Sequence, residues 1–372
     1  MEEFETQDII TVAFQGIEDP RVERTKAYSL PEILFLCLCA VLTGVKSWRG
    51  VAEFGEDKLD FLRKYLPYEN GTPCHQTIGR VMSLIKPSCF LKAYGEFLSE
   101  YFQVSSSKLV ALDGKTLRKS FDKTNKTPAI KTLNAWCVEN GLCLGHLKIP
   151  EGTNEITTIE DFLEFLHIEG AIVTTDALNT QKSIAKKIVE KKANYALPIK
   201  GNHKHLQQDI KLAFDTQKIP LENLIEKTEK GHGRIETREF SILPAPKNID
   251  FTEWQRLTAI GKYKTTVIKG EKETQEERYY LLSFLNLEEF ATAARKHWHV
   301  ENALHWTLDV VFREDDCRVR KDYAPDNFST IRKLALNILR NETAHKSSVP
   351  RKMARASRKE DYLELLLTPN KT

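Results

Sequence analysis

Two short apolar runs of this chain each end in an aspartate, and this pattern limits the fold more than any other feature. The first run covers residues 109–113 and ends at Asp113, and the second covers residues 171–176 and ends at Asp176. A third acid, Glu301, lies later in an amphipathic segment. Because buried acids need a partner, three acids directed at one core indicate a cation. Three carboxylates suit Mg²⁺, and many enzymes that cut phosphodiester bonds use such ions.

Each aspartate also has a simpler interpretation. An aspartate at a strand end often belongs to a turn, and Asp113–Gly114 has the composition of a turn. On a strand, however, Asp113 shares a face with Leu109 and Ala111, and ligands in open sheets gather at strand ends. Both interpretations stay open for either aspartate at this point.

The segment around Glu301 predicts a helix with one apolar stripe. At about 100° per residue, Glu301 falls within about 20° of the centre of that stripe. The stripe consists of Phe290, Ala294, Leu304 and Leu308, and His297, His305 and Asp309 follow the same side at four-residue steps. A glutamate there is paired, protonated or metal-bound, and an arginine partner is the simpler alternative. Zinc is disfavoured, because the spacing is not H-E-x-x-H.

The composition is that of a globular protein with a sizeable core. The 372 residues are 41% hydrophobic and 29% charged, which predicts two or three domains. The net charge of +3 is small, but basic residues cluster, as expected for a polyanionic substrate. For any one cluster, a solvated surface is the alternative. The clusters are Lys115, Arg118, Lys119, Lys123, Lys126 and Lys131; Arg313, Arg318, Arg320, Lys321, Arg332 and Lys333; and Arg351, Lys352, Arg355, Arg358 and Lys359.

Cysteine usage and the apolar runs predict a cytosolic protein without a membrane partner. The seven cysteines lack regular C-x-x-C spacing, which favours reduced thiols over a disulfide framework or a zinc site. The acidic start of the chain does not resemble a signal peptide. The most apolar run, residues 33–45, is shorter than the roughly 20 residues that span a bilayer. It predicts a buried helix capped by Ser29, with Glu32 completing a capping box.

Residues 1–105 have helical periodicity and predict an N-terminal helical domain. A short helix from Ser47 to Phe54, a turn over residues 70–73 and a second helix from His75 resemble a helix-turn-helix, which binds DNA. An ordinary helical bundle explains this pattern about as well.

From residue 106 the pattern changes to strands. We expect strands over residues 109–113, 133–138, 142–149, 172–176 and 195–199, a hairpin at Asn140–Gly141, and helices over 155–166 and 181–192. Residues 203–285 predict a β-rich insertion with one helix and three antiparallel strands. Residues 286–345 begin with a helix capped by Asn286 and Glu289, and residues 346–372 form a basic tail. This order predicts an α/β fold, a mixed sheet covered by helices, with core segments at 106–202 and 286–345.

Six motifs occur in an order typical of one family. They are ALDGKTLR (111–118), NEIT (154–157), TDALNTQ (175–181), KGN (200–202), GHGRIE (231–236) and HWxxENxxHWxLD (297–309). With them the chain resembles, over nearly its whole length, bacterial insertion-sequence transposases of the H-repeat-associated type, members of the DDE superfamily. The resemblance implies an RNase H-like core interrupted by the β-rich insertion. It also implies that Asp113, Asp176 and Glu301 are the catalytic, metal-binding triad.

What the resemblance implies about function extends to cofactors and partners. It implies metal-dependent cleavage and strand transfer at the terminal inverted repeats of an insertion sequence, with two Mg²⁺ ions per site and Mn²⁺ as a substitute. Double-stranded DNA, both terminal repeats and target, is the expected partner. A homodimer on DNA is expected because two ends are cut, in the bacterial cytoplasm at the nucleoid. A domesticated DNA-binding protein and a general RNase H-like nuclease are the alternatives.

One departure from the wider superfamily concerns the phosphate clamp. Many relatives carry an arginine four residues before the glutamate and a lysine seven after it, where this chain has His297 and Leu308. His297, Asn302 and His305 are therefore candidate replacements. Further candidate phosphate contacts are Lys115, Arg118, Lys200 and Arg234. Trp298 and Trp306 are expected in the core, with stacking on an unpaired base as the alternative.

Overall fold

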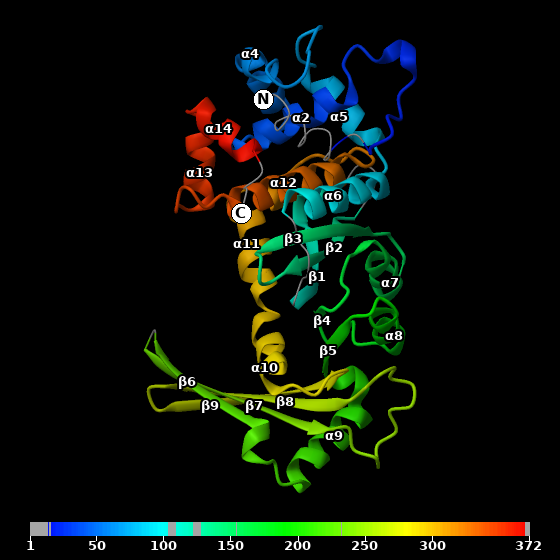
Figure 1. Cartoon of the computed structure of the whole chain (residues 1–372), viewed down its shortest axis with the longest axis vertical. Helices are drawn as coiled ribbons and strands as arrows, with labels where there is room; N and C mark the ends of the chain where they lie inside the picture. Colours follow the sequence, from blue (N-terminus) through cyan, green and yellow to red (C-terminus); the bar gives the residue numbers. More distant parts are fainter. Residues whose placement is uncertain are drawn as a thin grey trace.

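The computed structural model describes residues 14, 16–102, 109–121, 128–153, 155–231 and 233–368. These residues form one long mixed sheet, with helices covering its upper part and further helices beside its lower part (Figure 1). Four residues of the clusters and motifs above, Lys123, Lys126, Asn154 and His232, lie outside the described residues. None of the helices in the described part of the chain is long and apolar enough to cross a membrane.

Described residues 16–102 form helices. They are η1 (Glu23–Thr25), α2 (Leu30–Leu42), α3 (Trp48–Asp57), α4 (Leu59–Leu62), α5 (His75–Leu84) and α6 (Pro87–Tyr101). The predicted capping box starts α2: Ser29 Oγ accepts the backbone N–H of Glu32, and Glu32 Oε2 accepts the backbone N–H of Ser29. The expected buried helix is therefore confirmed, although it begins at Leu30 and ends at Leu42.

The predicted α/β class is confirmed by a nine-stranded mixed sheet in the order β3-β2-β1-β4-β5-β9-β8-β7-β6. β1 pairs antiparallel with β2 and parallel with β4. The strands are β1 (Leu109–Leu117), β2 (Ile130–Cys137), β3 (Leu142–Ile149), β4 (Ile172–Thr174), β5 (Asn194–Ile199), β6 (Leu224–Gly231), β7 (Arg234–Pro244), β8 (Ala259–Lys269) and β9 (Lys272–Leu282). The predicted hairpin joins β2 to β3, and Gly141 supplies the left-handed backbone of its turn (φ 63°).

Three features of the sheet differ from the predicted ones. β1 does not end at Asp113 but continues to Leu117, because the residues after Asp113 also pair with β2. β6 was not predicted, since its mostly exposed, charged residues show no apolar alternation. The strands of the 203–285 segment extend the core sheet instead of forming a separate one, because β9 pairs with β5.

Helices after β3 cover the sheet and connect its two halves. They are α7 (Glu155–Phe165), α8 (Lys182–Glu190), η3 (Gly201–His203), α9 (Lys204–Thr216), η4 (Leu221–Asn223), α10 (Leu287–Lys296), the π-helix η5 (Val300–His305), α11 (Trp306–Val310), η6 (Glu314–Asp316) and α12 (Ala324–Asn341). A short helix, η2 (Arg118–Ser120), lies between β1 and β2. The stretch from α10 to α11 runs as one rod from the β6–β9 strands to α12 (Figure 1). Asn286 caps α10 by accepting the backbone N–H of Glu289. The ring of Phe290 docks α10 over Gly261, where an added Cβ would lie 2.6 Å from that ring.

The basic segment from residue 346 is folded and is not an extended tail. It forms α13 (Val349–Ala356) and α14 (Glu360–Leu367), whose apolar residues Met353, Leu363 and Leu366 are buried. Lys352, predicted as part of a basic cluster, is also buried, and its Nζ donates to the backbone carbonyls of Leu339 and Glu342. Burial of these apolar side chains explains why the segment folds against α12.

Candidate active site

The three predicted acids line one cavity of about 420 Å³. Asp113 comes from β1, Asp176 from the loop after β4, and Glu301 from η5. The pairing explains why the first two meet: β1 and β4 run parallel up to the Ala111–Thr174 pair, so both aspartates follow just beyond it. The backbone N–H of Asn179 donates to Asp176 Oδ1 at 2.9 Å and holds this loop in place.

The pKa of Asp113 is shifted by burial and by the neighbouring acids. Burial, together with the negative charges of Glu301 and Asp176 and a smaller contribution from Glu155, raises its pKa to about 7. Asp113 is therefore within electrostatic reach of the other two carboxylates.

Glu301 lines the cavity because of a local backbone conformation that the helical periodicity did not predict. Its side chain is exposed, whereas Val300 and Leu304 are buried. The chain forms a π-helix over η5, whose wider turn shifts the side chains away from the 100° spacing of an α-helix. The four stripe residues are buried as expected, but the placement of Glu301 at the centre of that buried stripe was wrong.

The donor set fits a hard divalent cation in its chemistry. Within the described residues, no three His, Cys, Asp or Glu side chains stand close enough together to hold one ion. The cavity nevertheless brings together three carboxylates, the ligands that Mg²⁺ prefers. The pKa of Asp113 is raised by burial and by the repulsion of Glu301 and Asp176, and a cation in this cavity would stabilise the ionised carboxylate against both.

His305 and His297 are neutral neighbours of the acids. His305 Nδ1 lies 3.4 Å from Asp113 Oδ2, and its Nε2 lies 3.4 Å from Asn134 Nδ2. Because the Nδ2 group of Asn134 can only donate, Nε2 of His305 accepts, which leaves the proton of the neutral ring on Nδ1, the atom that faces Asp113. Burial lowers the pKa of His305 to about 4, with Lys115 and Lys333 adding to the effect. Burial and Arg278 likewise lower the pKa of His297 to about 4, so neither side chain replaces a cationic clamp at neutral pH.

Comparison with known proteins decides the family. Residues 11–98 match the family model described as DDE_Tnp_1-associated, and residues 105–338 match the Transposase DDE domain. The "H repeat-associated putative transposase YhhI" of Escherichia coli (strain K12) is 39% identical over 360 residues, covering 94% of this chain and 95% of that protein. The chain is an H repeat-associated DDE transposase.

Two further similarities accompany this transposase. The "H repeat-associated putative transposase YbfD" of the same strain is 36% identical over 239 residues, which cover 63% of this chain and 94% of that protein. The structure of the piggyBac transposase synaptic complex with hairpin DNA aligns with 99% of this chain and 83% of its own, at a TM-score of 0.42 and 10% identity. That structural similarity is too weak to carry an argument.

Lys115 of the transposase does not face a phosphate site, contrary to the prediction. It is only 8% exposed, and its Nζ lies 2.5 Å from Asp309 Oδ1 and 3.4 Å from Asp315 Oδ1. Glu314 Oε2 lies 3.7 Å from the same ammonium group. Because β1 continues beyond Asp113, Lys115 is a core residue of the strand, and three carboxylates already neutralise it.

The other predicted phosphate contacts are distributed over the surface. Lys200 is exposed and lines the cavity of the three acids, whereas Asn302 is exposed next to Glu301. Arg118 is exposed with its Nε 3.3 Å from Asp315, and Arg234 is exposed and paired with Glu236 at 3.1 Å. Neither of these two arginines lines the cavity.

Sequence reasoning missed Arg278 and Tyr280, which enter the cavity from β9. The guanidinium of Arg278 lies 5.3 Å from the ring of Trp298. Trp298 and Trp306 are 42% and 58% exposed, so their expected place in the core was wrong. The alternation of a strand puts Arg278 and Tyr280 on one face, but no local signal indicates that β9 borders the acids.

Proposed function

We propose that this transposase binds the terminal inverted repeats of an insertion sequence, cleaves DNA there and joins the freed 3′ ends to a target. The observation that carries this function is the group of three carboxylates around one cavity, with the pKa of Asp113 raised by its neighbours. An RNase H-like core is part of the proposal. The strand order β3-β2-β1-β4-β5, with an antiparallel meander followed by parallel strands, supports it.

Asp113, Asp176 and Glu301 would hold two Mg²⁺ ions, with Mn²⁺ as a substitute. When bound, such ions activate the attacking oxygen and stabilise the leaving oxygen of an in-line displacement. The protein's own side chains then orient the DNA: Lys200 and Arg278 supply positive charge beside the acids. Asn179 fixes the Asp176 loop, and His305 orients the Asp113 carboxylate.

Incubation with the DNA that flanks its own gene tests this function. With Mg²⁺, we expect cuts at the two ends of the element that leave free 3′ hydroxyls, and with EDTA we expect none. An unrelated duplex of equal length serves as the control. Equal cutting of both duplexes would instead identify a general nuclease. Binding without cutting in both Mg²⁺ and Mn²⁺ would identify a domesticated DNA-binding protein.

His305→Ala is expected to lower the cleavage rate about 10- to 100-fold, the usual cost of losing a group that orients a metal ligand. The Mg²⁺ concentration for half-maximal rate should rise as well, because Asp113 loses the imidazole nitrogen that lies 3.4 Å from its Oδ2. His305→Gln, which keeps an N–H donor, should partly restore both the cleavage rate and the Mg²⁺ concentration for half-maximal rate. An alanine variant with unchanged rate and unchanged Mg²⁺ dependence would show that His305 does not position Asp113.

The remaining parts of the proposal concern organisation. Two element ends require two active sites, so we expect a homodimer on DNA, in the bacterial cytoplasm at the nucleoid. The chain would divide into an N-terminal helical domain (1–105), a core in two parts (106–202 and 286–345), a β-rich insertion (203–285) and the basic C-terminal segment.

A further inference from the structure

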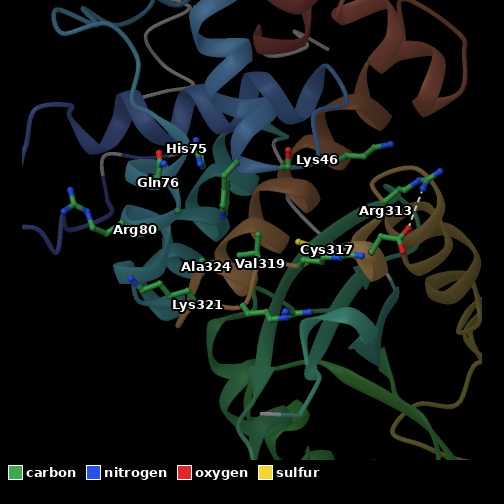
Figure 2. Close-up of a pocket in the computed structure, with 15 residues that line it drawn as sticks. Lys46, His75, Gln76, Arg80, Arg313, Cys317, Val319, Lys321 and Ala324 are labelled. Carbon is green, nitrogen blue, oxygen red and sulfur yellow. Dashed lines mark ion pairs between the residues drawn. The ribbon is translucent and has the colours of Figure 1, made fainter. Parts of the chain in front are cut away.

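A second cavity, of about 660 Å³, lies between the N-terminal helices and the segment after α11 (Figure 2). Its walls come from the starts of α3, α5 and α12 and from residues 313–321. Six cationic side chains line it, against the single carboxylate of Asp316. They are Lys46, Arg80, Arg313, Arg318, Arg320 and Lys321. Figure 2 shows Lys46 and Arg313 toward one end and Arg80 and Lys321 toward the other. We call this cavity the basic groove.

The helical wall of the basic groove is fixed by close packing. Trp48, at the start of α3, packs against Gly79 of α5, where an added Cβ would lie 3.2 Å from the indole Cδ1. The indole also packs at a tilt against Phe328 of α12, with ring centroids 4.1 Å apart. Asn327 Nδ2 donates to the carbonyls of Met82 and Ile85 at the end of α5. The three helices therefore hold one another in register, so this wall is rigid.

The opposite wall, residues 313–322, is held at both ends. Lys119 Nζ lies 2.5 Å from Asp316 Oδ1, and Asp315 pairs with Arg118 and Lys115. Left-handed backbone at Arg313 (φ 51°) and at Asp322 (φ 44°) bounds the segment. Such conformations cost energy in residues other than glycine, so the surrounding contacts must hold this path. Of the four acids of the segment, Glu314, Asp315 and Asp316 are thus occupied by cations of β1 and η2. The fourth, Asp322, is exposed at its end.

The remaining cations of the groove lack neutralising partners. Arg318 and Arg320 are exposed and alternate with the half-buried Cys317 and Val319 along an extended path, so both arginines face outward. In the part of the chain that the structure describes, Arg318, Arg320, Lys321, Lys46 and Arg80 form no ion pair within 4.0 Å. Uncompensated cations along a rigid concave wall attract a polyanion strongly.

The character of the lining favours a duplex over a single strand. Proteins that bind unpaired strands offer exposed aromatic rings on which bases stack. The two ring-bearing residues of this lining, Trp48 and His75, are half-buried, and Trp48 contacts Gly79 and Phe328, so the lining offers no fully exposed ring of that kind. We propose that the basic groove binds the phosphate backbone of duplex DNA, at a distance from the three acids. This inference rests on DNA as the substrate in the function proposed above.

The test is DNA binding by the double variant Arg318→Ala/Arg320→Ala, measured in EDTA so that no cleavage occurs. The probe is a fluorescein-labelled duplex from an end of the element. Its anisotropy is followed between roughly 50 and 300 mM salt, the range in which phosphate contacts respond. We expect binding about tenfold weaker or more, and a salt slope smaller by about 2, since each lost phosphate contact removes about 0.9. The matched control is Lys218→Ala/Lys247→Ala, which removes two exposed cations of loops outside the lining of the groove. It should bind like the unmodified protein.

Three results would contradict DNA binding by the groove. They are an affinity and salt slope of the groove variant equal to those of the unmodified protein, an equal loss of affinity in the control variant, and tighter binding of a single strand of the same length. A thermal melt confirms that the groove variant is folded. Binding in EDTA separates this inference from the proposed function. A protein that binds through the groove but never cuts supports the groove and contradicts the enzyme. A groove variant that binds and cuts DNA normally contradicts DNA binding by the groove but does not contradict the proposed cleavage activity.

Discussion

Asp113→Asn is expected to abolish DNA cleavage and to stabilise the metal-free protein at pH 8. The stability effect follows from the pKa of Asp113, which burial, Glu301 and Asp176 raise to about 7. A carboxyl with a raised pKa is ionised in the folded protein only at a cost. That cost is absent below about pH 4, develops as the pH rises from about 4 to 7, and is complete above pH 7. A shift of about 3 pKa units corresponds to about 4 kcal/mol.

Unfolding by urea in EDTA at pH 5 and pH 8 measures this effect. The free energy of unfolding of the variant should exceed that of the unmodified protein most at pH 8 and much less at pH 5. Added Mg²⁺ should raise the melting temperature of the unmodified protein at pH 8 more than that of the variant, because the variant lacks the Asp113 carboxylate. Asp161→Asn, at an exposed position of α7, is the matched control and should change neither property. Residual cleavage by Asp113→Asn, or an equal stability gain at both pH values, would contradict the assigned role.

The proximity of Asp113 and Asp176 could be predicted from the sequence. Each follows a short apolar run that predicts a strand, and equivalent positions of neighbouring parallel strands lie side by side. The helical pattern also singled out Glu301 as the third acid, but it placed this side chain at the centre of the buried stripe, whereas the side chain is exposed. Helical spacing assumes 100° per residue, and the π-helix at Val300–His305 breaks that assumption without any sequence signal that we recognised.

Contacts between distant segments escaped prediction for a different reason. Lys115 follows Asp113 and resembles a surface lysine, but its partners Asp309 and Asp315 come almost 200 residues later. The pairing of β9 with β5 also depends on the whole sheet. For this reason Arg278 could not be connected with the acids from the sequence. A local pattern specifies an element, whereas the neighbours of that element depend on the packing of the complete chain.

Glu314→Gln is expected to destabilise the protein by about 3–5 kcal/mol, the usual cost of removing one partner of a buried ion pair. Glu314 is only 1% exposed, and its Oε1 accepts the hydroxyl of Ser329 at 2.6 Å. Burial alone would raise its pKa, but Lys333, Lys115 and Arg332 outweigh burial and lower that pKa to about 2. Glutamine leaves the fully buried ammonium of Lys333 without its negative neighbour. Urea unfolding at pH 7 measures the loss.

The dependence on pH and a second variant distinguish lost charge from lost packing. Because the pKa of Glu314 is lowered, its contribution is present above about pH 4.5 and disappears as the pH falls from there toward 2. The stability difference from Glu314→Gln should therefore shrink over that interval. Glu314→Gln/Lys333→Met should recover part of the loss, since it removes the orphaned charge. A constant difference across this interval, with no recovery in the double variant, would mean that Glu314 acts through its shape. Since Lys115 also pairs with Glu314 and lies two residues from Asp113, the same charges anchor the strand that carries the proposed catalytic acid.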